Sequence, residues 1–260
     1  MAKRSRRPLL RAVRAASPAV QALIVAVFVF LAWASINWIY QTIGKPTELL
    51  FPLSGALAKN PPATWQAYGP LFREHATAVI TPDLLAALAQ VEGAGNPVAR
   101  TYWRWRASSN PFELYRPASS AVGMYQMTDA TFDDAKRYCI HDHVAVEDGP
   151  WDDVKSCWFN RLYARVVPGD AIELTSAWLD RAVATALARQ RGSVATLQQK
   201  QDLAALIHLC GRSAGEEYVK RRFRLAAHQR CGDHDVRNYL RRVTAMKRAF
   251  GKLAAADRAS

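Results

Sequence analysis

Hydrophobic positions divide this 260-residue chain into one long apolar run near its start and a series of shorter segments with helical periodicity. Residues 19–40 are apolar except for Gln21, Ser35 and Asn37, and a run of this length can cross a bilayer as a helix. Further along the chain, apolar side chains recur at intervals of three and four, which is typical of amphipathic helices around a core. The pattern predicts a mainly α-helical domain behind one transmembrane helix.

Changes in composition predict the domain organisation. Proline and glycine are frequent between residues 41 and 63, which indicates a linker. The last segment is helical and basic, and such a charge run is usually a solvated face; contact with a membrane surface or a partner is the alternative. We therefore expect a basic arm (1–18), the apolar helix (19–40), the linker (41–63), a single folded domain (64–234) and a basic helical tail (235–260).

Periodicity and turn residues outline the elements of this domain. Gly69-Pro70 argues against a continuous helix between Trp65 and His75. Thr128 can cap a helix whose stripe ends at Tyr138, and a loop is expected from His141 to Trp151. Further helices are expected at 151–166, 171–189, 198–209, 214–228 and 235–253.

The flanks of the apolar run predict its orientation. Positively charged residues precede it and no acidic residue occurs before Glu48, so the arm should stay cytoplasmic and the domain should be exported. Ala32-Trp33-Ala34 resembles a small-residue site that a signal peptidase could cleave, which is the alternative. Because the apolar character continues past that point, we favour a retained anchor in the inner membrane with the domain in the periplasm.

Net charge narrows the class of partner. The formal charge is +13, and part of it belongs to the arm, which leaves a moderately basic domain. Such a surface suits an anionic polymer such as a cell wall that carries acidic peptides. No nucleic-acid recognition motif is present, and the predicted export also argues against a nucleic-acid partner.

One helix carries the candidate catalytic residue. The segment TPDLLAALAQVEGAG begins with a cap at Thr81 and a first-turn Pro82, and it ends at Gly93. Glu92 lies on or beside its apolar face and in its last turn, where burial and the helix dipole both disfavour a negative charge. A carboxyl group that keeps its proton is what glycosidic cleavage needs as a general acid. The alternative is a last-turn glutamate rotated into solvent.

Two motifs in the expected order resemble one enzyme family. The pieces ALAQVEGAGNPVA and SSAVGMYQMTDATF are similar to the soluble-lytic-transglycosylase (SLT, family 1) branch of the lysozyme-like superfamily. Glu92 matches the family's catalytic glutamate. The resemblance implies an α+β lysozyme-like fold and a substrate-binding turn formed by Gly123, Met124, Tyr125 and Gln126.

The sequence departs from that family in two motifs, and the gap between its first two motifs is longer than usual. Gly93 stands where a serine usually follows the glutamate. The later Ala-Tyr-Asn-Ala-Gly-type motif is best matched by residues 207–211, where His208 falls, so its tyrosine and asparagine are replaced. His208 could line the cleft or be a satisfied core histidine.

The resemblance implies a mechanism with one carboxyl group and no cofactor. Glu92 would protonate the glycosidic oxygen between N-acetylmuramic acid and N-acetylglucosamine in peptidoglycan, and would then act as base on the C6 hydroxyl to give a 1,6-anhydro product. The alternatives are a weakly active binding or scaffold module and a hydrolytic muramidase. A muramidase would need a second carboxylate, for which the acids near in sequence are Glu113, Asp129, Asp133 and Asp134.

Aromatic and arginine residues alternate in the insert 100–117. Trp103 and Tyr115 are candidate sugar-stacking residues, since aromatic faces pack on sugar rings and arginines pair with carboxylates. Packing of a loop against the domain is the alternative. The pattern requires no strand here and allows a short hairpin. The predicted membrane topology, a wall-cutting domain anchored in the inner membrane, also suggests an envelope-spanning secretion or conjugation assembly as a partner.

An even number of cysteines in an exported domain implies two disulfides, with three connectivities open. Proximity favours Cys139–Cys157 and Cys210–Cys231. A metal site at Cys139, His141 and His143 does not match a standard zinc pattern, so no metal is expected.

Overall fold

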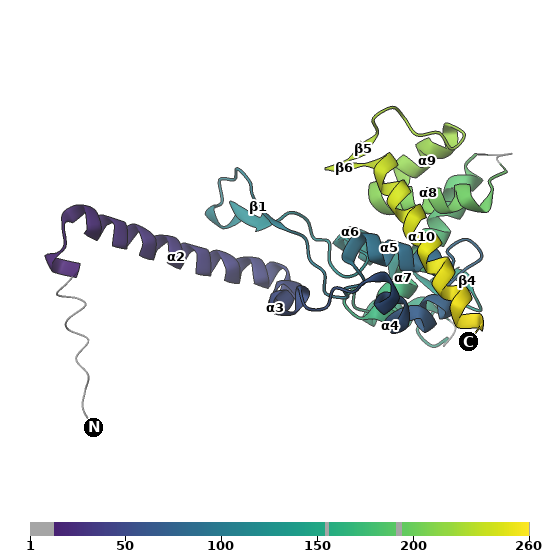
Figure 1. The fold of residues 1–260 in the computed structure, drawn as a ribbon, viewed down its shortest axis with the longest axis horizontal. Helices are drawn as coiled ribbons and strands as arrows, with labels where there is room; N and C mark the ends of the chain where they lie inside the picture. The colour runs from purple at the N-terminus through teal and green to yellow at the C-terminus, as the bar shows by residue number, and fades with distance from the viewer. Residues whose placement is uncertain (1–12, 154–155, 191–193, 260) are drawn as a thin grey trace, which may run out of the picture. The chain divides into compact units, whose positions relative to one another are not determined.

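Helices make up most of the chain in the computed structural model, and among the described residues the strands form two-stranded antiparallel sheets (Figure 1). The structure describes residues 13–153, 156–190 and 194–259. Most of the predicted basic arm therefore lies outside the described residues. The expected mainly α architecture is confirmed.

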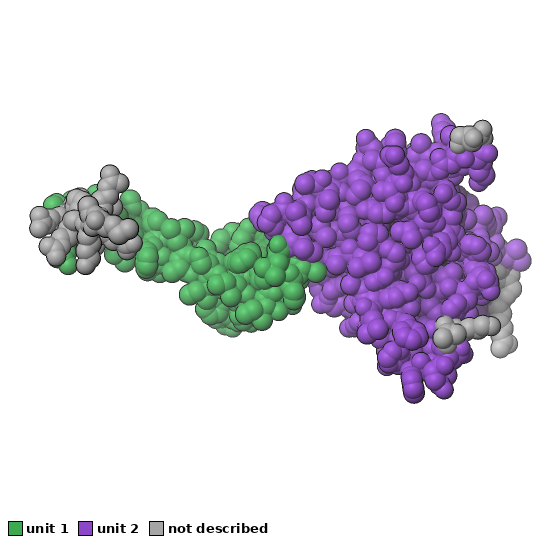
Figure 2. Space-filling model, turned by 90° about the horizontal axis from the view of Figure 1, so that it is seen from below, with its two compact units in different colours: residues 1–49, 102–118 green, residues 50–101, 119–260 purple. Residues whose placement is uncertain are grey.

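The chain separates into two compact units (Figure 2). Unit 1 contains residues 1–49 and 102–118, and unit 2 contains residues 50–101 and 119–260. The insert at 102–118 thus belongs with the apolar helix, whereas the sequence places it inside the domain 64–234. Since neighbouring residues in sequence need not share a core, composition alone does not reveal that residues 102–118 belong to unit 1.

Unit 1 is organised around α2 (Pro18–Gly44), which runs a turn further than the predicted apolar segment. Pro18 occupies the first turn, where a missing amide proton costs nothing, and the helix ends before Lys45-Pro46. This helix is long and apolar enough to cross a membrane, and its most apolar stretch is not buried within the protein. A soluble core helix would be mostly covered.

A short hairpin completes unit 1, as the sequence allowed. Strand β1 (Trp103–Trp105) pairs with β2 (Tyr115–Pro117), and Trp105 lies opposite Tyr115. The connection contains the 3-10 helix η2 (Pro111–Glu113). A second 3-10 helix, η1 (Pro46–Leu50), follows α2.

Unit 2 begins with α3 (Phe51–Ser54) and α4 (Pro61–Glu74), so part of the expected linker is helical. The expected break at Gly69-Pro70 was wrong, because α4 continues through it. Gly69 has no Cβ to clash with the ring of the following proline. Pro70 is exposed, and the carbonyl that loses its partner can be solvated there.

The middle of unit 2 holds a hairpin where the sequence predicted a loop. Helix α6 (Asp129–Ala135) is capped by Thr128 as expected, but Tyr138 belongs to strand β3 (Tyr138–His141). This strand pairs with β4 (Val144–Glu147). The left-handed conformations of the two residues between the strands allow the tight turn, and this turn chemistry was overlooked in the sequence.

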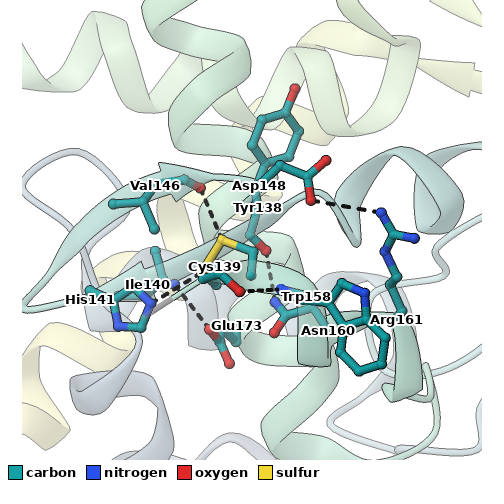
Figure 3. Close-up of a disulfide and its surroundings, with 12 residues drawn as sticks. Tyr138, Cys139, Ile140, His141, Val146, Asp148, Trp158, Asn160, Arg161 and Glu173 are labelled. Atoms are coloured by element: carbon teal, nitrogen blue, oxygen red, sulfur yellow. Dashed lines mark hydrogen bonds and ion pairs between the residues drawn. A yellow bond between two sulfur atoms is a disulfide. The ribbon is translucent and has the colours of Figure 1, made fainter. Parts of the chain in front are cut away.

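A disulfide links this hairpin to the next segment (Figure 3). Cys139 is bonded to Cys157, the pair that sequence proximity favours. Asn160 donates from Nδ2 to the Tyr138 carbonyl at 2.8 Å, which ties the same two segments together. The predicted helix at 151–166 was wrong, because the described part of that range contains the 3-10 helix η3 (Cys157–Leu162) and turns.

The remaining helices agree with the predicted ones in type and order, although α9 ends earlier than the predicted segment 214–228. A second disulfide joins Cys210 at the end of α8 to Cys231 in a two-residue strand, again the pair that proximity favours. The elements are α7 (Pro168–Ala188), α8 (Leu197–Cys210), α9 (Arg212–Lys220), β5 (Arg230–Cys231), β6 (His234–Asp235) and α10 (Val236–Ala259).

Helix α10 is part of the core of unit 2 and corrects the assignment of residues 235–260 to a tail. It packs against α5 (Pro82–Gly93), α4 and α8. Its buried face contributes Tyr239 and Phe250 to the same apolar cluster as Leu85 and Leu88 of α5. Most of its arginine and lysine side chains are exposed, so the net charge of α10 concealed a core-facing stripe.

Candidate active site

Glu92 lies in the last turn of α5, where the sequence places the candidate acid. Thr81 precedes the helix and Asp83 lies in its first turn, while Ala94 at its end adopts the left-handed conformation. The Glu92 side chain is 17% exposed, so it is mostly but not fully withdrawn from water. The alternative of a glutamate rotated into bulk solvent does not describe this side chain.

Tyr239 of α10 holds the Glu92 carboxyl group. Its hydroxyl donates to Oε1 at 2.5 Å. Burial and the adjacent Glu92 carboxylate raise the pKa of Tyr239 well above the usual value for tyrosine. The hydroxyl therefore keeps its proton and remains a donor. This hydrogen bond fixes the position of the Glu92 carboxyl group.

Sequence reasoning missed Tyr239 because it assigned α10 to a solvated tail. A signal was present in the spacing of the apolar residues Val236, Tyr239, Val243 and Phe250, which are all buried. These positions follow helical periodicity. On the same helix, Arg242 donates from Nη2 to the Val91 carbonyl at 3.2 Å, which ties α10 to the end of α5.

His208 approaches the same carboxyl group from α8. Its Nε2 lies 3.8 Å from Glu92 Oε1, and its side chain is 8% exposed. The ring packs edge-on against Tyr125 with the ring centroids 6.4 Å apart. The structure thus brings His208 to Glu92, although its low exposure fits the core histidine that the sequence left open.

The turn at Gly123–Gln126 is built as a rigid backbone loop. Gly123 has φ +84°, and a Cβ there would lie 2.4 Å from the Arg165 carbonyl oxygen. Gln126 donates from Nε2 to the carbonyls of Gly123 at 2.9 Å and Ala99 at 3.0 Å. The Gln126 amide group is therefore engaged in fixing the loop.

The side chains of Met124 and Tyr125 do not line a cleft, in contrast to the expectation from the resemblance. Met124 is fully buried and Tyr125 is 1% exposed. The Tyr125 hydroxyl donates to the Leu85 carbonyl at 3.2 Å, which anchors the turn to α5. Tyr125 therefore offers no free face for stacking on a sugar; its role in the described structure is packing.

Gly93 is explained by the approach of this turn. A Cβ at Gly93 would lie 2.9 Å from both Cα and the carbonyl oxygen of Met124. Because these are backbone atoms with little freedom to move, a serine here would force the turn and the helix apart. A glycine at position 93 thus fits the close approach of the turn to the end of α5.

Trp103 and Tyr115 belong to unit 1 and are described with it. Trp103 donates from Nε1 to Glu48 Oε2 at 2.9 Å, and its ring lies 5.3 Å from that of Tyr115. The two candidate sugar-stacking residues thus pack on each other within the hairpin. Unit 2 is what brings Glu92, Tyr239 and His208 together.

The cysteine and histidine residues leave no thiolate for a metal site. All the cysteines are in disulfides. Within the described residues, no three or more His, Cys, Asp or Glu side chains are grouped so that they could hold a metal ion. His141 Nε2 lies 3.3 Å from Cys139 Sγ, which is already bonded to Cys157.

No protein-family model, no curated protein and no solved structure matches the chain. What the site does must therefore be inferred from its residues and their geometry. These define a helical unit in which a partly buried carboxyl group accepts a hydrogen bond from a protonated tyrosine beside a histidine.

Proposed function

We propose that this chain is a membrane-anchored peptidoglycan lytic transglycosylase with a lysozyme-like domain, in which Glu92 is the catalytic acid and base. The observation that carries the proposal is the Glu92 carboxyl group, 17% exposed and bound at Oε1 by Tyr239. A mostly buried carboxyl group with one oxygen held by a hydrogen bond is suited to directional proton transfer. The two sequence motifs supply the substrate class.

Each step of the proposed reaction uses the same carboxyl group. Glu92 Oε2 first gives its proton to the glycosidic oxygen between N-acetylmuramic acid and N-acetylglucosamine as the bond to C1 breaks. The resulting carboxylate then takes the proton from the C6 hydroxyl of the muramic sugar, whose oxygen bonds to C1. Tyr239 would stabilise the carboxylate between the two steps, because a hydrogen bond to a charged acceptor is stronger than one to a neutral group.

A mechanism with one carboxyl group also fits the engagement of the other acids. A hydrolytic muramidase needs a second free carboxylate. Glu113 belongs to unit 1. The other three acids near Glu92 in sequence are paired with basic side chains: Asp129 with Arg165 at 2.6 Å, Asp133 with Lys136 at 3.3 Å and Asp134 with Arg212 at 2.6 Å.

The proposed location is the inner membrane, with α2 as a retained anchor and unit 2 in the periplasm. The exposed apolar surface of α2 and the two disulfides support an exported protein held at a membrane. A wall-cutting enzyme in this position suits remodelling beside an envelope-spanning secretion or conjugation complex.

Mass spectrometry of digested peptidoglycan tests the function. The detergent-solubilised full-length chain should release fragments with 1,6-anhydro ends, which are lighter by one water than reducing ends. Glu92→Gln should reduce product release about a hundred- to ten-thousandfold, since it removes the transferable proton. The matched control is Glu217→Gln, an acid on α9 that pairs with Arg221.

Other outcomes assign other functions. Reducing ends in place of anhydro ends would identify a hydrolytic muramidase. Binding to cell walls without products, unchanged by Glu92→Gln, would identify a scaffold module.

A further inference from the structure

Three polar side chains of α2 lie on one face and bind the hairpin of unit 1. Trp33, Asn37 and Gln41 follow one another at intervals of four residues, which places them on the same side of a helix. Trp33 Nε1 donates to the Pro111 carbonyl at 3.1 Å, Asn37 Nδ2 to the Tyr115 carbonyl at 2.8 Å and Gln41 Nε2 to the Phe112 carbonyl at 2.6 Å. Side chains of the apolar helix thus donate hydrogen bonds to backbone carbonyl groups of β2 and η2.

Aromatic rings extend the same contact. The rings of Trp33 and Trp105 are stacked with centroids 5.8 Å apart, and Tyr40 packs on Phe112 at 5.6 Å. Asn37 is buried by the hairpin to 2% exposure, although α2 is otherwise exposed along its apolar length. An unpaired amide donor on a helix in lipid is costly, and the hairpin provides the acceptor for Asn37 Nδ2.

The position of the contact along α2 places the hairpin at a membrane boundary. A span needs about 20 apolar residues, which from Pro18 end near Asn37. The basic residues before α2 favour a cytoplasmic N-terminus, so this boundary is the periplasmic one. Exposed Trp38 and Tyr40 are the residue types that anchor a helix at such a boundary.

The outer surface of the hairpin carries charge suited to lipid head groups. Arg104 and Arg106 are exposed on either side of Trp105, which is itself 64% exposed. Neither arginine has an ion-pair partner among the residues that the structure describes. Guanidinium groups bind phosphate in a bidentate manner, and tryptophan favours the interfacial layer.

We propose that the hairpin 102–118 is a membrane-interface element that docks on α2 and binds the phosphate groups of anionic phospholipids through Arg104 and Arg106. It rests on the membrane anchoring in the proposed function but not on the catalytic activity. Its ligand is the phospholipid head group, in place of the glycan that the aromatic sequence suggests.

Depth measurement with spin labels on the full-length chain in vesicles tests this inference. Because every cysteine is in a disulfide, a single added cysteine can be labelled at Ala107 in the hairpin. Val25→Cys on α2 provides the lipid reference, and Val194→Cys, at a position 96% exposed in unit 2, provides the water reference. Accessibility to oxygen and to a water-soluble nickel chelate reports the depth of each label.

The label at Ala107 should lie between the two references, and phosphatidylglycerol should move it toward the lipid reference relative to phosphatidylcholine alone. Each basic residue near an anionic surface contributes about fivefold to the ratio of membrane-bound to detached hairpin. The double variant Arg104→Gln with Arg106→Gln should therefore lower this ratio about 25-fold and remove the effect of phosphatidylglycerol on the label. The matched control, Arg222→Gln with Arg224→Gln, should retain the effect of phosphatidylglycerol.

Two results separate this inference from the anchor. If the label at Val25 behaves as in water, the anchor is wrong. If Val25 is in lipid while Ala107 matches Val194 in both lipid mixtures, or is unaffected by phosphatidylglycerol, the anchor stands and head-group binding is overturned. Protection of Ala107 by glycan strands in place of lipid would also overturn it.

Discussion

The helices α2 and α10 are both long, and they differ in where their apolar side chains lie. Side chains of α2 such as Phe28, which is 73% exposed, remain uncovered although the helix is almost wholly apolar. Helix α10 is rich in arginine and lysine, yet Phe250 is fully buried. Burial therefore follows the spacing of apolar residues within a helix and not its average composition. In the proposed function, α2 faces lipid, whereas the exposed arginine and lysine side chains of α10 face water.

Truncation of one phenylalanine in each helix tests the comparison most strongly. Phe250→Ala should reduce the free energy of unfolding of unit 2 by about 3–5 kcal/mol, because it leaves a cavity beside Trp65, whose ring centroid lies 6.0 Å away. Phe28→Ala should leave the unfolding of unit 2 unchanged, since Phe28 is exposed in unit 1. Denaturant titration followed by tryptophan fluorescence measures both. Equal effects of the two substitutions would contradict the assignment of α10 to the core.

The buried face of α10 should also matter for activity. Tyr239→Phe removes the hydroxyl that donates to Glu92 and keeps the ring that packs in the core. A hydrogen bond to a charged group is worth about 1.5–3 kcal/mol, so release of anhydro products should fall about ten- to a hundredfold. The loss should be independent of pH near neutrality, because the raised pKa of Tyr239 keeps the hydroxyl protonated there.

The matched control for Tyr239→Phe is Tyr218→Phe, which lies 6% exposed elsewhere in the core of unit 2. It should leave product release within about twofold of the unaltered chain. If the two substitutions have the same effect on activity, Tyr239 acts only through the stability of the fold.

The contrast between these helices also shows which features of the structure can be predicted from the sequence. Local signals predicted α5 and its Glu92, because a first-turn proline, periodicity and a terminal glycine all fall within one short segment. The Cys139–Cys157 and Cys210–Cys231 disulfides were likewise accessible, since each closes a short loop. Most helices of unit 2 were predicted for the same reason.

Features that join distant segments could not be predicted from local signals. Tyr239 is 147 residues from Glu92, and no spacing rule links them. The membership of residues 102–118 in unit 1 depends on backbone carbonyls, which every residue possesses and which leave no trace in the sequence. The buried stripe of α10 could have been predicted from the spacing of its apolar residues, but the charge of the helix was given more weight than this periodicity.

The smallest expected effect concerns the polar face of α2. Asn37→Leu removes the donor to the Tyr115 carbonyl and makes the helix more apolar, so insertion into the membrane should persist while the hairpin loosens. Hydrogen bonds between elements in a membrane contribute about 0.6 kcal/mol on average, which corresponds to about a threefold gain in the detached population. Hydrogen exchange at the amides of residues 103–117 measures this detached population in reconstituted vesicles.

Val29→Leu is the matched control, because Val29 is 59% exposed on α2 and is apolar before and after the change. Faster exchange in Asn37→Leu alone shows that the hairpin depends on the polar face of α2, whereas equal exchange in both variants means that aromatic stacking holds the hairpin in place.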